Sequence, residues 1–214
     1  MNYNTIKLYG KTLFFRRGMT ILVNLTFRCN LKCEYCNMII PTGKIKMFDH
    51  GFDFWVNKIE NFTSIHKVKE IMVSGGEPTL ISWMPNFVHW LLNKGYHVTI
   101  LCNGFRVDRI LEIPNSYRLQ VSMSYHHHTD KVEMQRKYDV LASRGYRVNI
   151  KELLDGKPRQ FSYSIPALRH CTKPEHLLME DKSFPVLNFG ANGQLYSGCY
   201  AMYEDCAVPK EEQK

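Results

Sequence analysis

The sequence predicts an α/β protein built on a parallel sheet, and two observations support this fold class. Strand-like segments alternate with helix-like segments along the chain, as they do in parallel α/β proteins. Glycine or polar residues follow directly after the strands, at the edge of the sheet where such proteins carry their chemistry. Six strand-helix units in a row indicate an open or closed parallel barrel.

The predicted strands are short, apolar and bounded by turn residues. They cover residues 20–26, 69–76, 96–104, 116–124, 146–154 and 184–190. The second strand runs into a glycine turn. A turn at Asn192-Gly193 follows the sixth strand and leads into a further short strand.

Three helices are predicted from apolar residues that recur at helical spacing. The first covers residues 52–62, and its apolar face consists of Phe52, Trp55, Val56 and Ile59. The second stops at Gly95, and its apolar side consists of Trp83, Phe87, Val88, Trp90 and Leu91. The third opens at a capping box of Asp130 and Glu133 and ends at Gly145. Residues 155–184 contain several prolines, and we expect a loop with short helices there.

The composition is that of a globular protein with a core of its own. Of the 214 residues, 44% are hydrophobic and 22% are charged, which fits one domain with a small appendage. We expect a core barrel over residues 1–190, with residues 1–18 as an N-terminal lead-in, and a short C-terminal extension over residues 191–214. No apolar run approaches the ~20 residues of a membrane span, and the N-terminus lacks the layout of a signal peptide. These features predict a cytoplasmic protein without a membrane partner.

The formal net charge of +8 would suit an anionic partner such as a nucleotide, phosphate or nucleic acid. However, the Lys and Arg residues are scattered, and no run of five or six like charges occurs. A basic, solvated surface therefore stays open as the simpler interpretation.

Three of the seven cysteines, Cys29, Cys33 and Cys36, lie within eight positions. In a chain without an export signal, such clustering indicates metal or catalytic chemistry rather than disulfides. A structural zinc site usually pairs two Cys-x2-4-Cys halves, so here His50 would have to be the fourth ligand. Alternatively, three thiolates hold an iron–sulfur cluster and leave one iron open to a substrate or cofactor. The spacing favours the cluster.

Several motifs resemble those of the radical S-adenosylmethionine (radical SAM) superfamily. Residues 29–36, CNLKCEYC, are similar to its C-x3-C-x-aromatic-C signature. Residues 74–78, SGGEP, follow the second strand as the GGE motif of the family does. Residues 101–104, LCNG, resemble a Thr-Asn-Gly that closes the third strand, and residues 121–124, VSMS, resemble the polar end of the fourth. The resemblance covers roughly residues 18–190 and implies a partial (β/α)6 TIM-like barrel.

The resemblance implies a 4Fe–4S cluster ligated by Cys29, Cys33 and Cys36, with SAM chelating the fourth iron through its amino and carboxylate groups. Reductive cleavage of SAM then gives a 5′-deoxyadenosyl radical that abstracts a hydrogen atom from the substrate. An external electron donor of flavodoxin or ferredoxin type is implied as well.

The same resemblance implies cofactor-binding roles for other residues. Tyr35 would pack near the adenine, and the Gly75-Gly76 backbone would approach the methionyl amino group, where a side chain has no room. Glu77 would hold this turn and Pro78 would stiffen it. The other candidates are polar residues at strand ends. Asn103 belongs to the motif that closes the third strand, Ser122 or Ser124 could hydrogen-bond the ribose, and Lys151 or Asn149 could meet the carboxylate.

The sequence predicts neither the residues that act on the substrate nor the substrate, which stays open between a peptide or protein and a nucleotide or RNA. His126, His127 and His128 follow the fourth strand; one of them could bind substrate or donate a proton, although an exposed loop is the simpler interpretation. The tail is faintly similar to SPASM or twitch extensions. We expect it to be a degenerate remnant rather than an auxiliary cluster site made by Cys171, Cys199 and Cys206.

Two other functions remain as alternatives. One is an activating enzyme that installs a glycyl radical on a partner protein. The other is a non-enzymatic zinc module that binds nucleic acid, with Cys29, Cys33, Cys36 and His50 as ligands. The GGEP turn has no role in such a zinc module, so this turn is the sequence feature that favours a radical SAM enzyme over the zinc module. The oligomeric state is not predicted.

Overall fold

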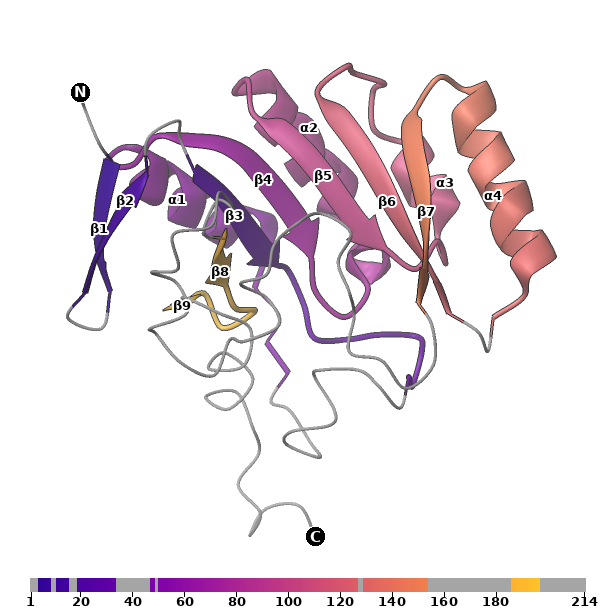
Figure 1. Ribbon diagram of the computed structural model, residues 1–214, viewed down its shortest axis with the longest axis horizontal. Coiled ribbons are helices and arrows are strands. Elements are labelled where there is room, and N and C mark those ends of the chain that lie inside the picture. The colour runs from indigo at the N-terminus through magenta and orange to yellow at the C-terminus, as the bar shows by residue number, and fades with distance from the viewer. Residues whose placement is uncertain are drawn as a thin grey trace, which may run out of the picture.

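A computed structural model shows the fold and describes residues 4–8, 11–15, 19–33, 47–48, 50–126, 129–153 and 186–196 (Figure 1). Its central sheet has the strand order β7-β6-β5-β4-β3-β8-β9. The strands are β3 (Met19–Asn24), β4 (Val68–Ser74), β5 (His97–Cys102), β6 (Leu119–His126), β7 (Arg147–Leu153), β8 (Val186–Phe189) and β9 (Leu195–Tyr196). All neighbours from β7 to β8 pair in parallel, and β9 is antiparallel to β8. The predicted class, a parallel six-stranded α/β sheet, is confirmed.

Helices follow strands of this sheet; most of them lie behind it in the view of Figure 1, and one stands beside β7 at the right. They are α1 (Phe52–Thr63), α2 (Met84–Asn93), α3 (Val107–Leu111) and α4 (Lys131–Ser143), with a short 3-10 helix η1 (Pro78–Leu80). The Asp130 side chain caps α4 by accepting from the backbone N–H of Val132 at 2.8 Å and of Glu133 at 3.3 Å. The Glu133 carboxylate pairs with Arg136 at 2.7 Å, so the capping box is formed by its Asp130 half.

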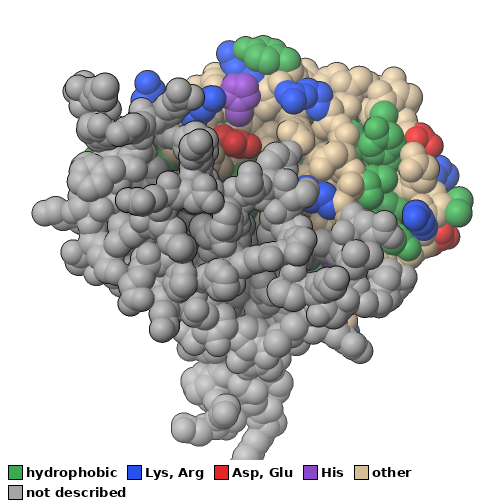
Figure 2. Space-filling view, viewed as in Figure 1, with side chains coloured by type: hydrophobic (Ala, Val, Ile, Leu, Met, Phe, Trp, Pro, Cys, Tyr) green, Lys and Arg blue, Asp and Glu red, His purple; other side chains and the backbone are tan. Residues whose placement is uncertain are grey.

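None of the helices in the described ranges is long and apolar enough to cross a bilayer. In the described part of the surface seen in Figure 2, Lys and Arg side chains stand apart from one another rather than forming one patch. The visible charge distribution therefore matches the scattered pattern of the sequence.

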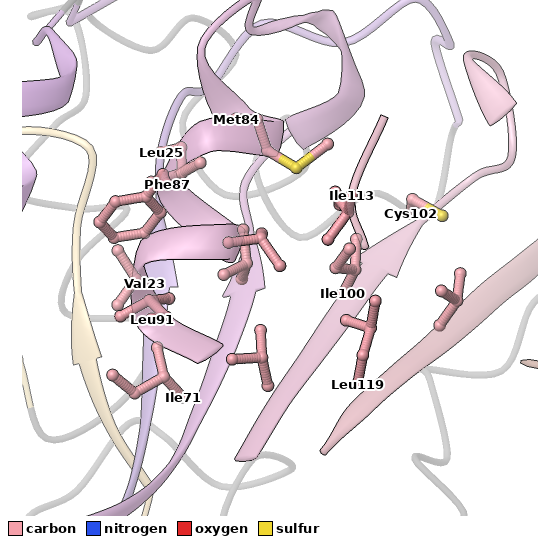
Figure 3. Packing of buried hydrophobic residues seen from close by; sticks show 14 of the residues in the cluster. Val23, Leu25, Ile71, Met84, Phe87, Leu91, Ile100, Cys102, Ile113 and Leu119 are labelled. Atoms are coloured by element: carbon pink, nitrogen blue, oxygen red, sulfur yellow. The ribbon is translucent and has the colours of Figure 1, made fainter. Parts of the chain in front are cut away.

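The core lies between the sheet and the helices, because alternate side chains of each strand point to this side. Ile21, Val23, Ile71 and Ile100 are fully buried there, and they pack with Phe87, Leu91 and Met84 of α2 (Figure 3). Burial of each such side chain contributes roughly 1.5–3 kcal/mol to folding. The amphipathic face that the sequence predicts for α2 is the face that packs on the sheet.

The opposite face of the sheet carries many polar side chains around a small apolar cluster of Leu22, Met72 and Leu101. The Glu70 carboxylate accepts from the Thr20 hydroxyl at 3.3 Å and from the Thr99 hydroxyl at 2.9 Å, which links β3, β4 and β5. The Gln120 amide donates to Asn149 at 3.2 Å between β6 and β7. A parallel sheet buried on both faces by helices would carry apolar residues on both. This face is therefore suited to a polar ligand.

Three features of the fold were not predicted from the sequence. Residues 1–18 were expected as a lead-in, and they contain an antiparallel hairpin, β1 (Asn4–Leu8) and β2 (Lys11–Phe15). The five-residue helix α3 was not predicted, because one turn and a half is too short to show a period. Finally, β8 lies beside β3, the first parallel strand, so the last parallel strand pairs with the first.

Candidate functional site

The carboxyl ends of β3, β4, β5 and β6 lie at one edge of the sheet because these strands are parallel. The candidate residues follow these ends: Cys29 after β3, Gly75-Gly76 after β4, Asn103 after β5, and His126 as the last residue of β6. The structure thus brings the predicted motifs to a common edge. In parallel α/β proteins this is the edge at which ligands bind.

The glycine turn after β4 holds the segment that leads from β3 to the cysteines. The Gly76 N–H donates to the Thr26 carbonyl at 2.8 Å, and the Glu77 N–H donates to the Arg28 carbonyl at 2.8 Å. The Leu25 N–H donates to the Ser74 carbonyl at 3.0 Å. These bonds continue the β3–β4 ladder beyond the sheet and end one residue before Cys29.

Both glycines are required by this close approach of two backbones. A Cβ on Gly75 would lie 2.3 Å from the Thr26 carbonyl oxygen, and one on Gly76 would lie 2.1 Å from that of Arg28. Gly75 also has φ of +145°, which side chains rarely adopt. The resemblance assigns these glycines to the approach of SAM. In the structure, the nearest neighbours of both missing side chains are backbone atoms of residues 26–28.

Glu77 is fully buried and joins the turn after β4 to the end of β5. One carboxylate oxygen accepts from the Thr79 N–H at 3.1 Å and from its hydroxyl, and the other accepts from the Asn103 N–H at 2.6 Å. Burial raises the pKa of this carboxyl above its ordinary value, while the three hydrogen bonds act in the opposite direction. Pro78 follows as the first residue of η1 and is itself buried. Glu77 therefore has a structural role, because it connects the segment after β4 to the segment after β5.

Two of the three clustered cysteines are among the described residues, and their environments differ. Cys29 is exposed, and its sulfur accepts from the Leu31 N–H at 3.4 Å and from the Asn103 amide at 3.9 Å. Asn103 also donates to the Asn30 side chain at 2.9 Å, so the loop after β5 holds the cysteine loop. Cys33 is buried. Cys36 and Tyr35 lie outside the described residues, as do Cys171, Cys199 and Cys206.

The imidazole of His126 lies against Cys33, with 3.4 Å between Nδ1 and the sulfur. His126 is 3% exposed, so this contact is shielded from water. The His126 carbonyl accepts from the Thr129 N–H at 2.8 Å and from its hydroxyl at 2.7 Å, which joins Thr129 to the end of β6. His127 and His128 lie outside the described residues. The sequence predicts all three histidines after a strand that ends at residue 124, whereas the structure extends β6 to His126 and so distinguishes this residue.

The remaining SAM candidates lie on β6 and β7. In the register of these strands Ser122 is opposite Asn149 and Ser124 is opposite Lys151. Ser122 is 1% exposed, and its hydroxyl has no hydrogen-bond partner among the described residues. The structure thus brings Ser122, Ser124 and Lys151 together on the polar face of the sheet.

Two other sequence interpretations concern single residues. The His50 ring stacks on Phe54, with 3.7 Å between ring centroids, so it belongs to an aromatic cluster at the start of α1. Within the described ranges no group of three His, Cys, Asp or Glu side chains is placed to hold a metal ion. Cys102 is buried in the core, and burial raises the pKa of its thiol.

The fold is a parallel α/β sheet, and the three closely spaced cysteines of the sequence follow its strand β3. Residues 23–156, more than half of the chain, match the family model of the radical SAM superfamily. The chain therefore belongs to the radical SAM superfamily and is a radical SAM enzyme. The alternative of a non-enzymatic zinc module is not supported, because this family consists of enzymes.

The chain is similar to known proteins over parts of its length. A GTP 3′,8-cyclase of Helicobacter pylori is 26% identical over 164 residues, which are 63% of this chain and 50% of the relative. A protein of Methanocaldococcus jannaschii that carries the name of a glycyl-radical enzyme activating enzyme is 31% identical over 88 residues, 41% of this chain and 33% of its own. The chain thus spans between a third and a half of the length of these relatives.

Among solved structures, BtrN in complex with AdoMet and 2-DOIA superposes with a TM-score of 0.61 and 18% identity, covering 90% of this chain and 77% of BtrN. This similarity confirms the fold, a partial barrel of the radical SAM type. Membership of the family implies SAM and an iron–sulfur cluster. The described residues fit these groups, because thiolates are suited to iron–sulfur clusters and Cys29 and Cys33 lie at the edge where the polar face begins.

Proposed function

We propose that Cys29, Cys33 and Cys36 ligate a 4Fe–4S cluster, at which SAM is cleaved reductively to a 5′-deoxyadenosyl radical that abstracts hydrogen from the substrate. The observation that carries this proposal is the backbone ladder between residues 26–28 and the Gly75–Glu77 turn. It fixes the start of the cysteine loop against the motif that the resemblance assigns to SAM. An isolated metal-binding loop would need no such support.

The protein's own residues would position SAM and shield it. The Gly75-Gly76 turn and Asn103 hold the cysteine loop, and Glu77 ties both to the sheet. Ser122 or Ser124 would donate to the ribose, and Lys151 would pair with the carboxylate of SAM. The buried Ser122 hydroxyl supports this assignment, since a buried polar group without a partner costs roughly 1–3 kcal/mol and a ligand can supply one. Tyr35 would pack near the adenine.

We infer that the substrate is a nucleotide or carries one. Relatives of this chain are named GTP 3′,8-cyclase and S-adenosylmethionine-dependent nucleotide dehydratase. The polar face supports a hydrophilic substrate: both amide atoms of the fully buried Asn188 on β8 have no hydrogen-bond partner among the described residues. The formal charge of +8 agrees with an anionic substrate. The relative named as an activating enzyme favours a second candidate, hydrogen abstraction from a glycine of a partner protein.

Reconstitution tests the chemistry. The protein is loaded anaerobically with iron and sulfide, given SAM and dithionite, and assayed for 5′-deoxyadenosine. We expect product from the wild type and none from Cys33→Ala, whereas Cys102→Ala, which removes a thiol buried in the core, should keep the activity of the fraction that folds. A flavodoxin or ferredoxin should replace dithionite. Intact SAM in the presence of a formed cluster would contradict the proposal.

The substrate class is tested by adding nucleoside triphosphates and peptides separately to this reaction. A nucleotide that accelerates 5′-deoxyadenosine formation and itself changes in mass would support the inference. Acceleration by peptides alone would contradict it. A glycyl radical signal in the electron paramagnetic resonance (EPR) spectrum of an added partner protein would favour the second candidate.

A further inference from the structure

The contact between His126 and Cys33 joins two residues that are 93 positions apart, and both are buried. His126 ends β6, whereas Cys33 lies in the loop after β3, so the sheet fixes the position of His126 and the path of the loop sets the position of Cys33. In the sheet order, two strands, β5 and β4, lie between them. The loop must therefore reach across the carboxyl edge to place the Cys33 sulfur at His126.

We propose that His126 is a positioning residue that donates a hydrogen bond from Nδ1 to the Cys33 sulfur and thereby makes the cluster easier to reduce. This inference rests on the proposed function, because it requires Cys33 to be a cluster ligand. A sulfur bound to iron carries no proton, so it can act in this contact as acceptor alone. The imidazole must then hold its proton on Nδ1, and the distance of 3.4 Å fits a hydrogen bond to sulfur.

The direction of the effect follows from charge. Reduction adds one negative charge to the cluster, and a donor directed at a ligating sulfur stabilises the more negative state. Burial strengthens the interaction, since water cannot screen it. The Leu31 N–H, by contrast, donates to the sulfur of Cys29, which is exposed, so water screens that interaction. Of the two described cysteines, Cys33 is thus the one whose environment can tune the cluster most strongly.

The test is an EPR-monitored redox titration of the reconstituted cluster without SAM, which reads the cluster and not turnover. In His126→Leu we expect the ratio of reduced to oxidised cluster at a fixed potential to fall about tenfold, a shift of about 59 mV for a one-electron couple. His126→Asn places an amide N–H near the position of Nδ1 and should restore most of the ratio. His126→Gln reaches the position of Nε2 and should not.

His97→Leu is the matched control, because His97 is exposed at the start of β5, at the opposite edge of the sheet. Its ratio should equal that of the wild type. Iron and sulfide content is measured for every variant. If His126→Leu does not fold, the comparison of His126→Asn with His126→Gln still tests the proposal, because only the Asn amide lies near the position of Nδ1. Equal ratios, within twofold, for His126→Asn, His126→Gln and the wild type would overturn the proposal.

Two further outcomes separate this inference from its foundation. If the wild type forms a cluster and cleaves SAM while the variants keep its potential, the proposed function stands and the role of His126 falls. If His126 itself binds the metal, SAM will not change the EPR spectrum of the wild-type cluster and His126→Leu will lose metal; this result overturns the hydrogen-bond role. A wild type that binds zinc without sulfide overturns both proposals.

Discussion

Replacement of Gly76 by Ala tests the close approach that supports the cysteine loop. The added Cβ would lie 2.1 Å from the Arg28 carbonyl oxygen, and real Cβ contacts are essentially never shorter than 3.0 Å, so the two backbones must separate by about 0.9 Å. The bonds from the N–H groups of Gly76 and Glu77, both 2.8 Å, would then stretch to about 3.7 Å and be lost.

The expected cost follows from these changes. Two hydrogen bonds contribute about 0.5–1.5 kcal/mol each, and overpacking adds about 1–3 kcal/mol. Together they lower the free energy of unfolding by about 2–6 kcal/mol, less about 0.4–1 kcal/mol that Ala contributes by restricting the unfolded chain. For a chain of this size, 1 kcal/mol corresponds to about 2–4 °C in Tm.

The assay is urea unfolding of the metal-free protein followed by circular dichroism. Gly51→Ala is the matched control, because Gly51 has φ of −81° and a Cβ there meets nothing within 4 Å. Its stability should stay within about 1 kcal/mol of the wild type. If Gly76→Ala is as stable as Gly51→Ala, the backbone contact with residues 26–28 does not exist as described, and the argument for the ladder fails.

Three other changes are predicted from the structure. Glu77→Gln should lower the free energy of unfolding by about 1–3 kcal/mol near pH 5, because the amide nitrogen cannot accept a hydrogen bond, whereas the carboxyl presents an oxygen to the donors on both sides in either protonation state. Burial raises the pKa of Glu77, so the folded protein binds the proton more tightly than the unfolded chain. The wild type should therefore lose stability as pH rises above about 4.5, and the difference in free energy of unfolding between it and Glu77→Gln should narrow. Parallel pH profiles of stability for the two proteins would contradict this. Asp130→Ala removes the cap of α4 and should cost about 0.5–2 kcal/mol in urea unfolding, with Asp139→Ala, an exposed site inside the helix, as its control. Phe87→Ala should cost about 3–5 kcal/mol in the same assay, since the ring is fully buried among Phe52, Trp83 and Trp90, and a cost below 1 kcal/mol would show a loosely packed core.

The sequence was sufficient for the elements whose pattern is local. Strand and helix positions followed from apolar spacing, and the motifs at residues 29–36 and 74–78 marked the family and the active edge. Even the half of the capping box made by Asp130 was visible in the sequence. These predictions succeeded because propensity, turn chemistry and periodicity agree within each segment.

Contacts between distant segments could not be predicted in the same way. Nothing in the spacing of residues near Glu77 shows that its carboxylate accepts from Asn103 at the next strand end. The pairing of His126 with Cys33 depends on the path of a loop and not on a pattern. The glycines were interpreted through the ligand, whereas the steric need comes from the neighbouring backbone. The roles of Ser122, Ser124 and Lys151 toward SAM stay predictions.

The position of β8 beside β3 has a consequence for synthesis of the protein. The Asn24 side chain donates to the Phe189 carbonyl at 3.1 Å, across a separation of 165 residues. As the chain leaves the ribosome from its N-terminus, β3 to β7 can assemble first, and the outer side of β3 then remains an open strand edge until β8 arrives. Open edges invite pairing with other chains. We therefore expect nascent chains that end before residue 186 to aggregate or to bind chaperones. We also expect the cysteine loop, which follows directly from β3, to be ready for iron only after β8 has been synthesised.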